Sequence, residues 1–145
     1  LLAVGLGLPA TGVDAAPAAI EIARRKATER HLAARFLVHD ALELGTLGGQ
    51  FDTVLDSGLF HLFGDKERSR YAESLRRVVP PGGHYFMVCF SDRQPGTLGP
   101  RRVSQAEIEA TFAEGWQIDA IVAVTMEVKN NPAGVRAWRA SLTRL

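Results

Sequence analysis

Short apolar runs alternate with amphipathic segments along most of this 145-residue chain. Four runs have the length and composition of strands, and they occupy residues 8–13, 35–38, 51–55 and 85–90. After the first run, Ile20, Ala23 and Ala27 repeat at helical spacing, which predicts an amphipathic helix. Repeated strand–helix units of this kind favour a mostly parallel sheet with helices on both of its faces.

Local signals predict where the helices begin and end. Pro17 suits the first turn of a helix, because a backbone N–H has no partner there. Asp65 can cap a further helix, which Pro80–Gly83 would end. The apolar stripe of that helix consists of Tyr71, Leu75, Val78 and Val79. Ser104 and Glu107 have the spacing of a capping box, so a last helix should begin there.

The end of the chain has a different pattern. Trp116–Val128 and Val135–Leu145 both read as strands, and only Lys129–Gly134 separates them. This linker is too short for a crossover helix, so the two strands should pair antiparallel. The sequence therefore predicts one α/β domain over residues 1–145, with six strands and a reversed strand at one edge of a single sheet.

Charge and composition exclude several classes of protein. The 17 basic and 16 acidic residues give a formal net charge of +1, which provides no signal for binding nucleic acid or a membrane surface. Cys89 is the single cysteine, so an internal disulfide is excluded and a reducing, cytoplasmic location is expected. No metal site is expected either, because the histidines are scattered and have no supporting carboxylate pattern. They are His31, His39, His61 and His84.

Acidic residues follow three of the expected strands. They are Asp14, Asp40 and Asp56, and ligands of open α/β sheets bind beyond the carboxyl ends of the strands. Asp14 can accept hydrogen bonds from both hydroxyls of a ribose, and this fold favours that role over the alternative that Asp14 only begins the next helix. Asp40 can accept from an adenine amine, with the N–H of Ala41 available to a ring nitrogen, or it is simply a solvated loop residue.

The segment from Asp56 to Phe63 combines a carboxylate, a small hydroxyl, a glycine, aromatic residues and a histidine. Aromatic faces can lie against a sulfonium cation, and Phe60 and Phe63 are expected to be walls of a pocket. His61 titrates in the range that is useful for accepting a substrate proton, so it is the candidate catalytic base. The alternative for His61 is a packing role in the core.

Several of these segments together resemble class I methyltransferases that use S-adenosylmethionine (SAM), a Rossmann-like family. The matching segments are Thr11–Ile20, Phe36–Ala41, Phe51–Ser57 and Val79–Gly83, in this order and followed by the terminal hairpin. Within that family, Asp56–His61 and Cys89–Asp92 are similar to the small-molecule branch. This branch includes thiopurine and tellurite-resistance type enzymes and those that methylate hydroxylated heterocycles.

The resemblance implies a function and a set of site residues. Asp14 and Ala15 would hold the ribose of SAM, and Asp40 and Ala41 the adenine. Asp56 and Ser57 would approach the methionyl end, and His61 would face the substrate. The implied reaction is transfer of a methyl group from SAM to oxygen, nitrogen or sulfur of a small aromatic or heterocyclic acceptor. Nothing in the sequence indicates the oligomeric state.

The chain departs from the family pattern at its start. Family members begin with a strand and a glycine-rich loop, and neither precedes the first expected strand here. Leu1–Gly7 instead reads as the end of a helix, so the first central strand is expected to be missing from this chain. Two alternatives stay open: a non-catalytic remnant or interaction module of the same fold, and a nicotinamide-dependent oxidoreductase in which Asp14 would hold the ribose.

Overall fold

The computed structural model describes residues 1–97, 99–129 and 131–145. The chain divides into two compact units, Leu1–Leu47 and Gly48–Leu145, and each has its own sheet. The single domain expected from the sequence stays a prediction. Among the described residues, no helix is both long enough and apolar enough to cross a membrane.

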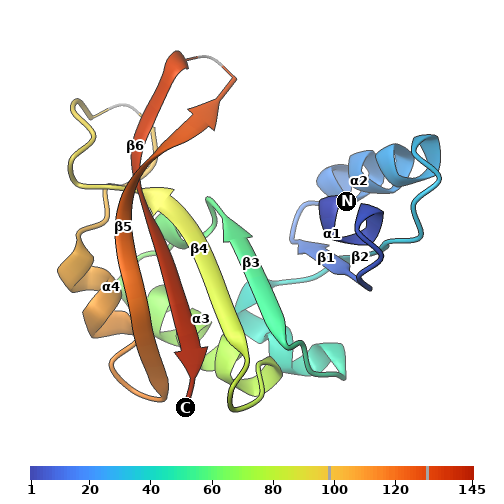
Figure 1. Cartoon of the computed structure of the whole chain (residues 1–145), viewed down its shortest axis with the longest axis horizontal. Helices are drawn as coiled ribbons and strands as arrows, with labels where there is room; N and C mark the ends of the chain where they lie inside the picture. Colours follow the sequence, from blue (N-terminus) through green and yellow to red (C-terminus); the bar gives the residue numbers. More distant parts are fainter. Residues whose placement is uncertain (98, 130) are drawn as a thin grey trace. The chain divides into compact units, whose positions relative to one another are not determined.

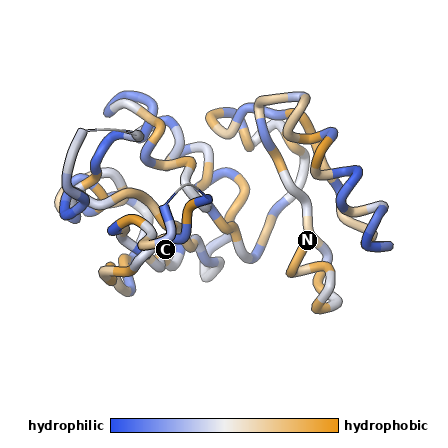
Figure 2. Tube along the Cα trace, turned by 90° about the horizontal axis from the view of Figure 1, so that it is seen from above, coloured by the Kyte–Doolittle hydropathy of each residue, from blue (hydrophilic) through white to orange (hydrophobic). Residues whose placement is uncertain are grey.

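The first unit, Leu1–Leu47, is a small strand–helix–strand unit. Its elements are α1 (Leu2–Gly5), β1 (Thr11–Asp14), α2 (Pro17–Glu29), β2 (Arg35–Val38) and the 3-10 segment η1 (Ala41–Leu47). Strands β1 and β2 pair parallel, with Asp14 opposite Val38. Pro17 is the first residue of α2, as predicted. Figure 2 shows how α2 becomes hydrophilic toward its end, while Ile20 and Ala27 are its buried residues.

The second unit, Gly48–Leu145, contains a mixed four-stranded sheet. Its strands are β3 (Thr53–Ser57), β4 (His84–Phe90), β5 (Trp116–Val128) and β6 (Asn131–Arg144). Its helical segments are η2 (Phe60–Leu62), α3 (Asp65–Val78) and α4 (Gln105–Thr111). The strand order is β3-β4-β6-β5, in which β3 and β4 are parallel and β6 is antiparallel to both neighbours (Figure 1). The predicted antiparallel pairing of the last two strands is confirmed; Asn130, in the predicted linker, lies outside the described residues.

Two expectations about the sheet were wrong. The six strands form two separate sheets rather than one, because β1 pairs with β2 alone and β3 with β4 alone. The reversed strand, β6, lies inside its sheet and β5 takes the edge. The burial of the two strands explains this order, since β6 contains the fully buried Ala140 and Leu142 whereas most of β5 is partly or fully exposed.

Both described α-helices of the second unit cover the same face of its sheet (Figure 1). Tyr85 of β4 is fully buried on this face. Its ring packs against Tyr71 of α3 at 6.1 Å and against Phe112, which follows α4, at 5.5 Å. These aromatic contacts require both helices on the side of the sheet to which Tyr85 points.

The helix ends confirm one cap and correct another. The side-chain oxygen of Ser104 accepts from the N–H of Glu107, and Glu107 accepts from the N–H of Ser104 at 2.8 Å, as the capping box predicted. Asp65 does not cap α3, because Gly64 occupies the cap position and Asp65 is the first helical residue. Gly64 instead donates its N–H to Glu67 at 2.8 Å.

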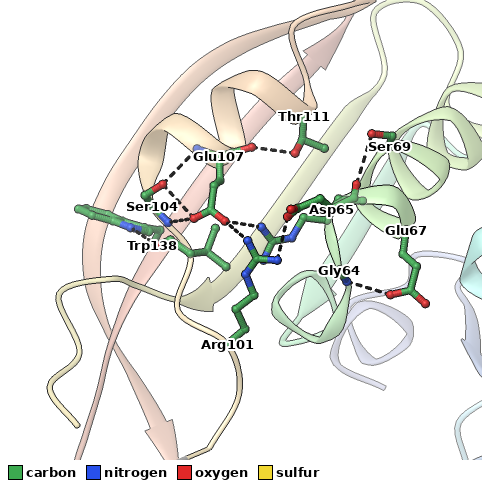
Figure 3. A network of polar contacts seen from close by, with 11 residues as sticks. Gly64, Asp65, Glu67, Ser69, Arg101, Ser104, Glu107, Thr111 and Trp138 are labelled. Atoms are coloured by element: carbon green, nitrogen blue, oxygen red, sulfur yellow. Dashed lines mark hydrogen bonds and ion pairs between the residues drawn. The ribbon is translucent and has the colours of Figure 1, made fainter. Parts of the chain in front are cut away.

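Glu107 also links the two helices of the second unit (Figure 3). It accepts a hydrogen bond at 2.9 Å from Arg68, which is 2% exposed, and it pairs with Arg101. Arg101 in turn lies 2.8 Å from Asp65. Burial alone would raise the pKa of Glu107, but the hydrogen bonds from Ser104 and Arg68 outweigh it and lower the pKa to about 2.

Cys89 of β4 and Trp138 of β6 lie in the core of the second unit. Cys89 of β4 is fully buried, and burial raises the pKa of its thiol to about 12. Trp138 lies opposite Cys89 on β6, and its indole N–H donates to the carbonyl of Val103 at 3.0 Å. Trp138 is therefore a core residue.

Candidate functional site

The carboxyl edge of the β1–β2 sheet presents Asp14, which is exposed. Its Oδ1 accepts from the N–H of Ala16 at 2.8 Å, and Ala16 is the cap residue of α2. No described residue hydrogen-bonds to the second oxygen, Oδ2. Asp14 therefore supports the start of the helix and still has an oxygen for a ligand, with the exposed Ala15 beside it.

Asp40 lies at the same edge, just beyond the end of β2. Its Oδ1 accepts from the N–H of Leu42 at 2.9 Å, and its side chain is exposed. Ala41 follows as the first residue of η1. The N–H of His39 donates to the carbonyl of Asp14 at 3.0 Å, which joins the two strand ends. The first unit thus brings Asp14, Ala15, Asp40 and Ala41 to one edge of its sheet.

Asp56 of β3 differs from Asp14 and Asp40, because it is buried and its carboxylate already accepts hydrogen bonds from four protein groups. Four groups donate to its carboxylate: the N–H groups of Leu59 (2.8 Å) and Phe60 (3.2 Å) and the hydroxyls of Tyr71 (3.2 Å) and Tyr85 (2.9 Å). Burial raises the pKa of Asp56, and these hydrogen bonds oppose that rise without cancelling it. The carboxylate therefore holds the loop after β3 in place.

Ser57 and Gly58 follow Asp56 in this loop. Ser57 is exposed, and no described residue hydrogen-bonds to its hydroxyl. Gly58 has a φ of +89°, a conformation that side chains disfavour, and its N–H donates to the carbonyl of Val88 at 2.9 Å. Asp56 and the sheet thus fix a turn that presents the hydroxyl of Ser57 to solvent.

His61 of η2 lies beside the end of β4 and is only 5% exposed. Its Nδ1 accepts from the N–H of Phe90 at 3.1 Å, and the two rings lie 4.9 Å apart. Burial lowers the pKa of His61, and the positive charges of Arg68 and Arg102 lower it further. The imidazole is therefore held neutral at the carboxyl ends of β3 and β4.

The second unit thus brings Asp56, Ser57 and His61 to one edge of its sheet. Sequence reasoning missed the residues that hold them, namely Tyr71 and Tyr85 around Asp56 and Phe90 beside His61. Both tyrosines looked like ordinary core residues, and Phe90 acts through its backbone N–H. No signal in the sequence identifies such a partner.

A pocket of about 310 Å³ lies at the carboxyl end of β4. It is lined by Ser91, Arg93, Ala123, Val124, Thr125, Arg136 and Ala137. Ser91 directly follows β4, and the other lining residues come from the next loop and from β5 and β6. Within the part of the chain that the structure describes, no cluster of three or more His, Cys, Asp or Glu could hold a metal ion.

Comparison with known proteins shows the family. Residues 2–83 match the family described as "Methyltransferase domain". The chain is 36% identical over 118 residues to 2-heptyl-1-hydroxyquinolin-4(1H)-one methyltransferase of Mycobacteroides abscessus, which covers 79% of this chain and 52% of the relative. It is 40% identical over 93 residues to demethylmenaquinone methyltransferase of Thermus thermophilus, covering 64% of this chain and 41% of the relative.

A solved structure described as "Conversion of a Disulfide Bond into a Thioacetal Group during Echinomycin Biosynthesis" has the same fold. Its TM-score is 0.86 at 35% identity, and the match covers 97% of this chain and 68% of that one. The chain therefore belongs to the class I SAM-dependent methyltransferase family. It spans about half the length of the two curated relatives described above. The alternative of a nicotinamide-dependent oxidoreductase finds no support in these matches.

Proposed function

We propose that the chain contributes to methyl transfer from SAM to oxygen, nitrogen or sulfur of a small aromatic or heterocyclic acceptor. The observation that carries the proposal is the loop after β3, in which the buried Asp56 fixes the exposed Ser57 and the neutral His61 at one sheet edge. This edge is where ligands of open α/β sheets bind. Family membership supports the reaction class.

The groups available to SAM fall into two kinds. The Oδ2 atom of Asp14 and the hydroxyl of Ser57 have no partner among the described residues and lie on exposed side chains, so they fit as direct contacts. Asp40, Ala41 and Ala15 are proposed as further contacts of SAM beside Asp14. Asp56 is proposed as a positioning residue, because four protein donors already occupy its carboxylate. SAM supplies the electrophilic methyl group on its sulfonium when it is bound.

For the acceptor, we propose a hydroxylated heterocycle. The relative from Mycobacteroides abscessus is named for 2-heptyl-1-hydroxyquinolin-4(1H)-one, which is such a compound. The burial of His61 and the Phe90 ring 4.9 Å from it suit a flat, apolar ring system. His61 is proposed to face this acceptor.

The proposal is tested by measuring SAM binding first and methyl transfer second. Calorimetry with SAM would be performed on the 145-residue chain. Methyl transfer to 2-heptyl-1-hydroxyquinolin-4(1H)-one would then be measured by mass spectrometry. The proposal expects SAM binding and a product heavier by one methylene unit. Absence of SAM binding would favour the alternative of a non-catalytic remnant.

A further inference from the structure

The two ring nitrogens of His61 have different surroundings. Nδ1 lies 3.1 Å from the backbone nitrogen of Phe90, the last residue of β4. A backbone N–H can only donate, so Nδ1 must offer its lone pair and has no proton of its own. In a neutral imidazole the proton then lies on Nε2. The backbone of β4 therefore selects the tautomer of His61.

The surroundings of the ring also keep it from gaining a second proton. A proton on Nδ1 would point at the N–H of Phe90 and replace a hydrogen bond by a repulsion. Burial and the charges of Arg68 and Arg102 lower the pKa of His61, which acts in the same direction. Nδ1 is thus unavailable as a proton acceptor, and Nε2 already holds its proton.

The Nε2 edge of the ring faces Gly58. A Cβ atom at position 58 would lie 3.3 Å from Cε1 and 3.7 Å from Nε2 of His61, and 3.5 Å from Cε of Met126. Glycine therefore leaves this edge uncovered by a side chain. No hydrogen-bond partner for Nε2 is found among residues 1–97, 99–129 and 131–145. His61 is otherwise nearly fully buried, so its Nε2–H is an unpartnered donor at the edge of the proposed acceptor site.

From this geometry we infer that His61 donates a hydrogen bond through Nε2–H to the acceptor, and that the nucleophilic oxygen or sulfur of the acceptor arrives already ionised. This role rests on the proposed methyl transfer, and it replaces the base that the sequence suggested. The lone pair of the anion forms the new bond to the methyl carbon while the carbon–sulfur bond of the sulfonium breaks. The sulfonium leaves as a neutral thioether, and no proton moves.

The inference selects a class of acceptor. Acidic groups such as the N-hydroxyl of a hydroxyquinolone or an aromatic thiol are ionised near neutral pH and would accept from Nε2–H. A simple phenol, whose hydroxyl titrates near that of tyrosine at a pKa of about 10, would arrive protonated and compete poorly. Donation from a fixed N–H orients the anion toward the methyl group without serving as its base.

The tautomer can be measured without any turnover. The full chain would be labelled with ¹⁵N-histidine, and long-range proton–nitrogen spectra would be recorded at neutral pH. The signals of His61 would be identified by their loss in H61N, with H84N as the matched control for an exposed histidine. We expect a neutral ring protonated on Nε2. A ring protonated on Nδ1, or on both nitrogens, would overturn the inference whether or not the chain is an active methyltransferase.

Two amide variants then separate the functions of the two nitrogens. In H61N the amide oxygen can still accept from Phe90, but the Nε2–H donor is lost. In H61Q the amide nitrogen can replace that donor, but Phe90 loses its acceptor. With 2-heptyl-1-hydroxyquinolin-4(1H)-one as the acceptor, we expect H61N to lower turnover by about 10- to 100-fold, the usual range for one hydrogen bond to a charged group. H61Q should keep turnover within about 5-fold of the wild type and lower the melting temperature.

Each competing role predicts a different result for this pair. If His61 is a base, both variants lose turnover alike, since neither amide takes a proton. If His61 only packs, H61N keeps the full rate for each folded molecule. Either result would overturn the inference, as would equal turnover of phenol and the N-hydroxyquinolone. If the wild type transfers no methyl group at all, the proposed function fails, and the NMR experiment alone decides the tautomer.

Discussion

The two sheets of this chain end in carboxylates that lie in opposite surroundings. At the edge of the β1–β2 sheet, Asp14 and Asp40 are exposed, and the side chain of each accepts a hydrogen bond from the backbone N–H two residues further along. At the end of β3, Asp56 is 7% exposed and accepts four hydrogen bonds. The same residue type at equivalent strand ends therefore has two different environments.

The difference shows how to distinguish a binding carboxylate from a structural one. A carboxylate with an exposed oxygen can exchange water for a ligand at small cost. A buried carboxylate that satisfies two tyrosine hydroxyls and two backbone N–H groups cannot be withdrawn from them without leaving unpaired donors. We therefore expect substitutions at Asp56 to affect folding, and substitutions at Asp14 to affect the cofactor.

The largest effect is expected for Asp56→Ala. This change leaves four buried or partly buried donors without their acceptor, and we expect a loss of about 3–4 kcal/mol in the free energy of unfolding. Urea unfolding followed by tryptophan fluorescence measures it, because Trp116 and Trp138 both lie in the second unit. The control is Asp52→Ala, an exposed aspartate just before β3. Equal losses in the two variants would refute the structural role of Asp56.

A smaller effect is expected for Glu107→Ala. Glu107 is the hydrogen-bond acceptor of Nη1 of the buried Arg68, whose Nε and Nη2 have no hydrogen-bond partner in the described residues. Its removal leaves a buried cation unpaired, and we expect a loss of about 2–3 kcal/mol. The matched control in the first unit is Glu29→Ala, which removes an exposed pair with Arg25 at 3.8 Å and should cost less than about 0.5 kcal/mol. A small loss at Glu107 would show that Arg68 is satisfied in another way.

For Asp14→Ala we expect the cofactor to respond and the fold to stay intact. Loss of hydrogen bonds from a ribose to a charged acceptor should weaken SAM binding by about 1.5–2 kcal/mol, or about 10- to 30-fold. Circular dichroism should show the spectrum of the folded wild type with only a small drop in melting temperature, because the hydrogen bond from Ala16 at the start of α2 is lost. Glu21→Ala, an exposed acid on α2, serves as the control for calorimetry. Unchanged SAM affinity would remove Asp14 from the proposed site.

The smallest effect concerns the pH dependence of stability. The pKa of folded His61 lies below its ordinary value of 6.5, so the unfolded chain takes up this proton first as pH falls. Protonation therefore favours unfolding, and the stability that the neutral His61 provides is lost as pH falls from about 7.5 to about 5.5. Urea midpoints at both pH values should show a larger fall for the wild type than for H61N. A parallel fall would mean that other groups cause the pH dependence.

Local signals in the sequence predicted the elements well. Pro17 marks the start of α2, and the Ser104–Glu107 capping box marks that of α4, because both depend on residues a few positions apart. The length of the linker between the last strands was enough to predict their antiparallel pairing. The position of β6 inside the sheet was not predicted, since strand order depends on contacts between distant segments.

The site was predicted as a set of residues but not as a set of roles. Asp56 has the same sequence context as Asp14, a residue at the end of a short apolar run. What separates them is burial of Asp56 under Tyr71 and Tyr85, which lie 15 and 29 positions away. The state of His61 depends on a backbone N–H, which every residue except proline possesses. Neither fact is visible in the sequence.

The burial of Cys89 gives the two units separate experimental signatures. The thiol lies in β4, fully covered, with a pKa of about 12, so almost none of it is thiolate at neutral pH. A thiol reagent in solution can therefore react only when the sheet of the second unit opens. Because the chain has no other cysteine, the labelling rate measures how often Gly48–Leu145 opens and does not depend on opening of Leu1–Leu47. A ligand that slows the labelling must therefore stabilise the second unit, and this can be detected without any assay of catalysis.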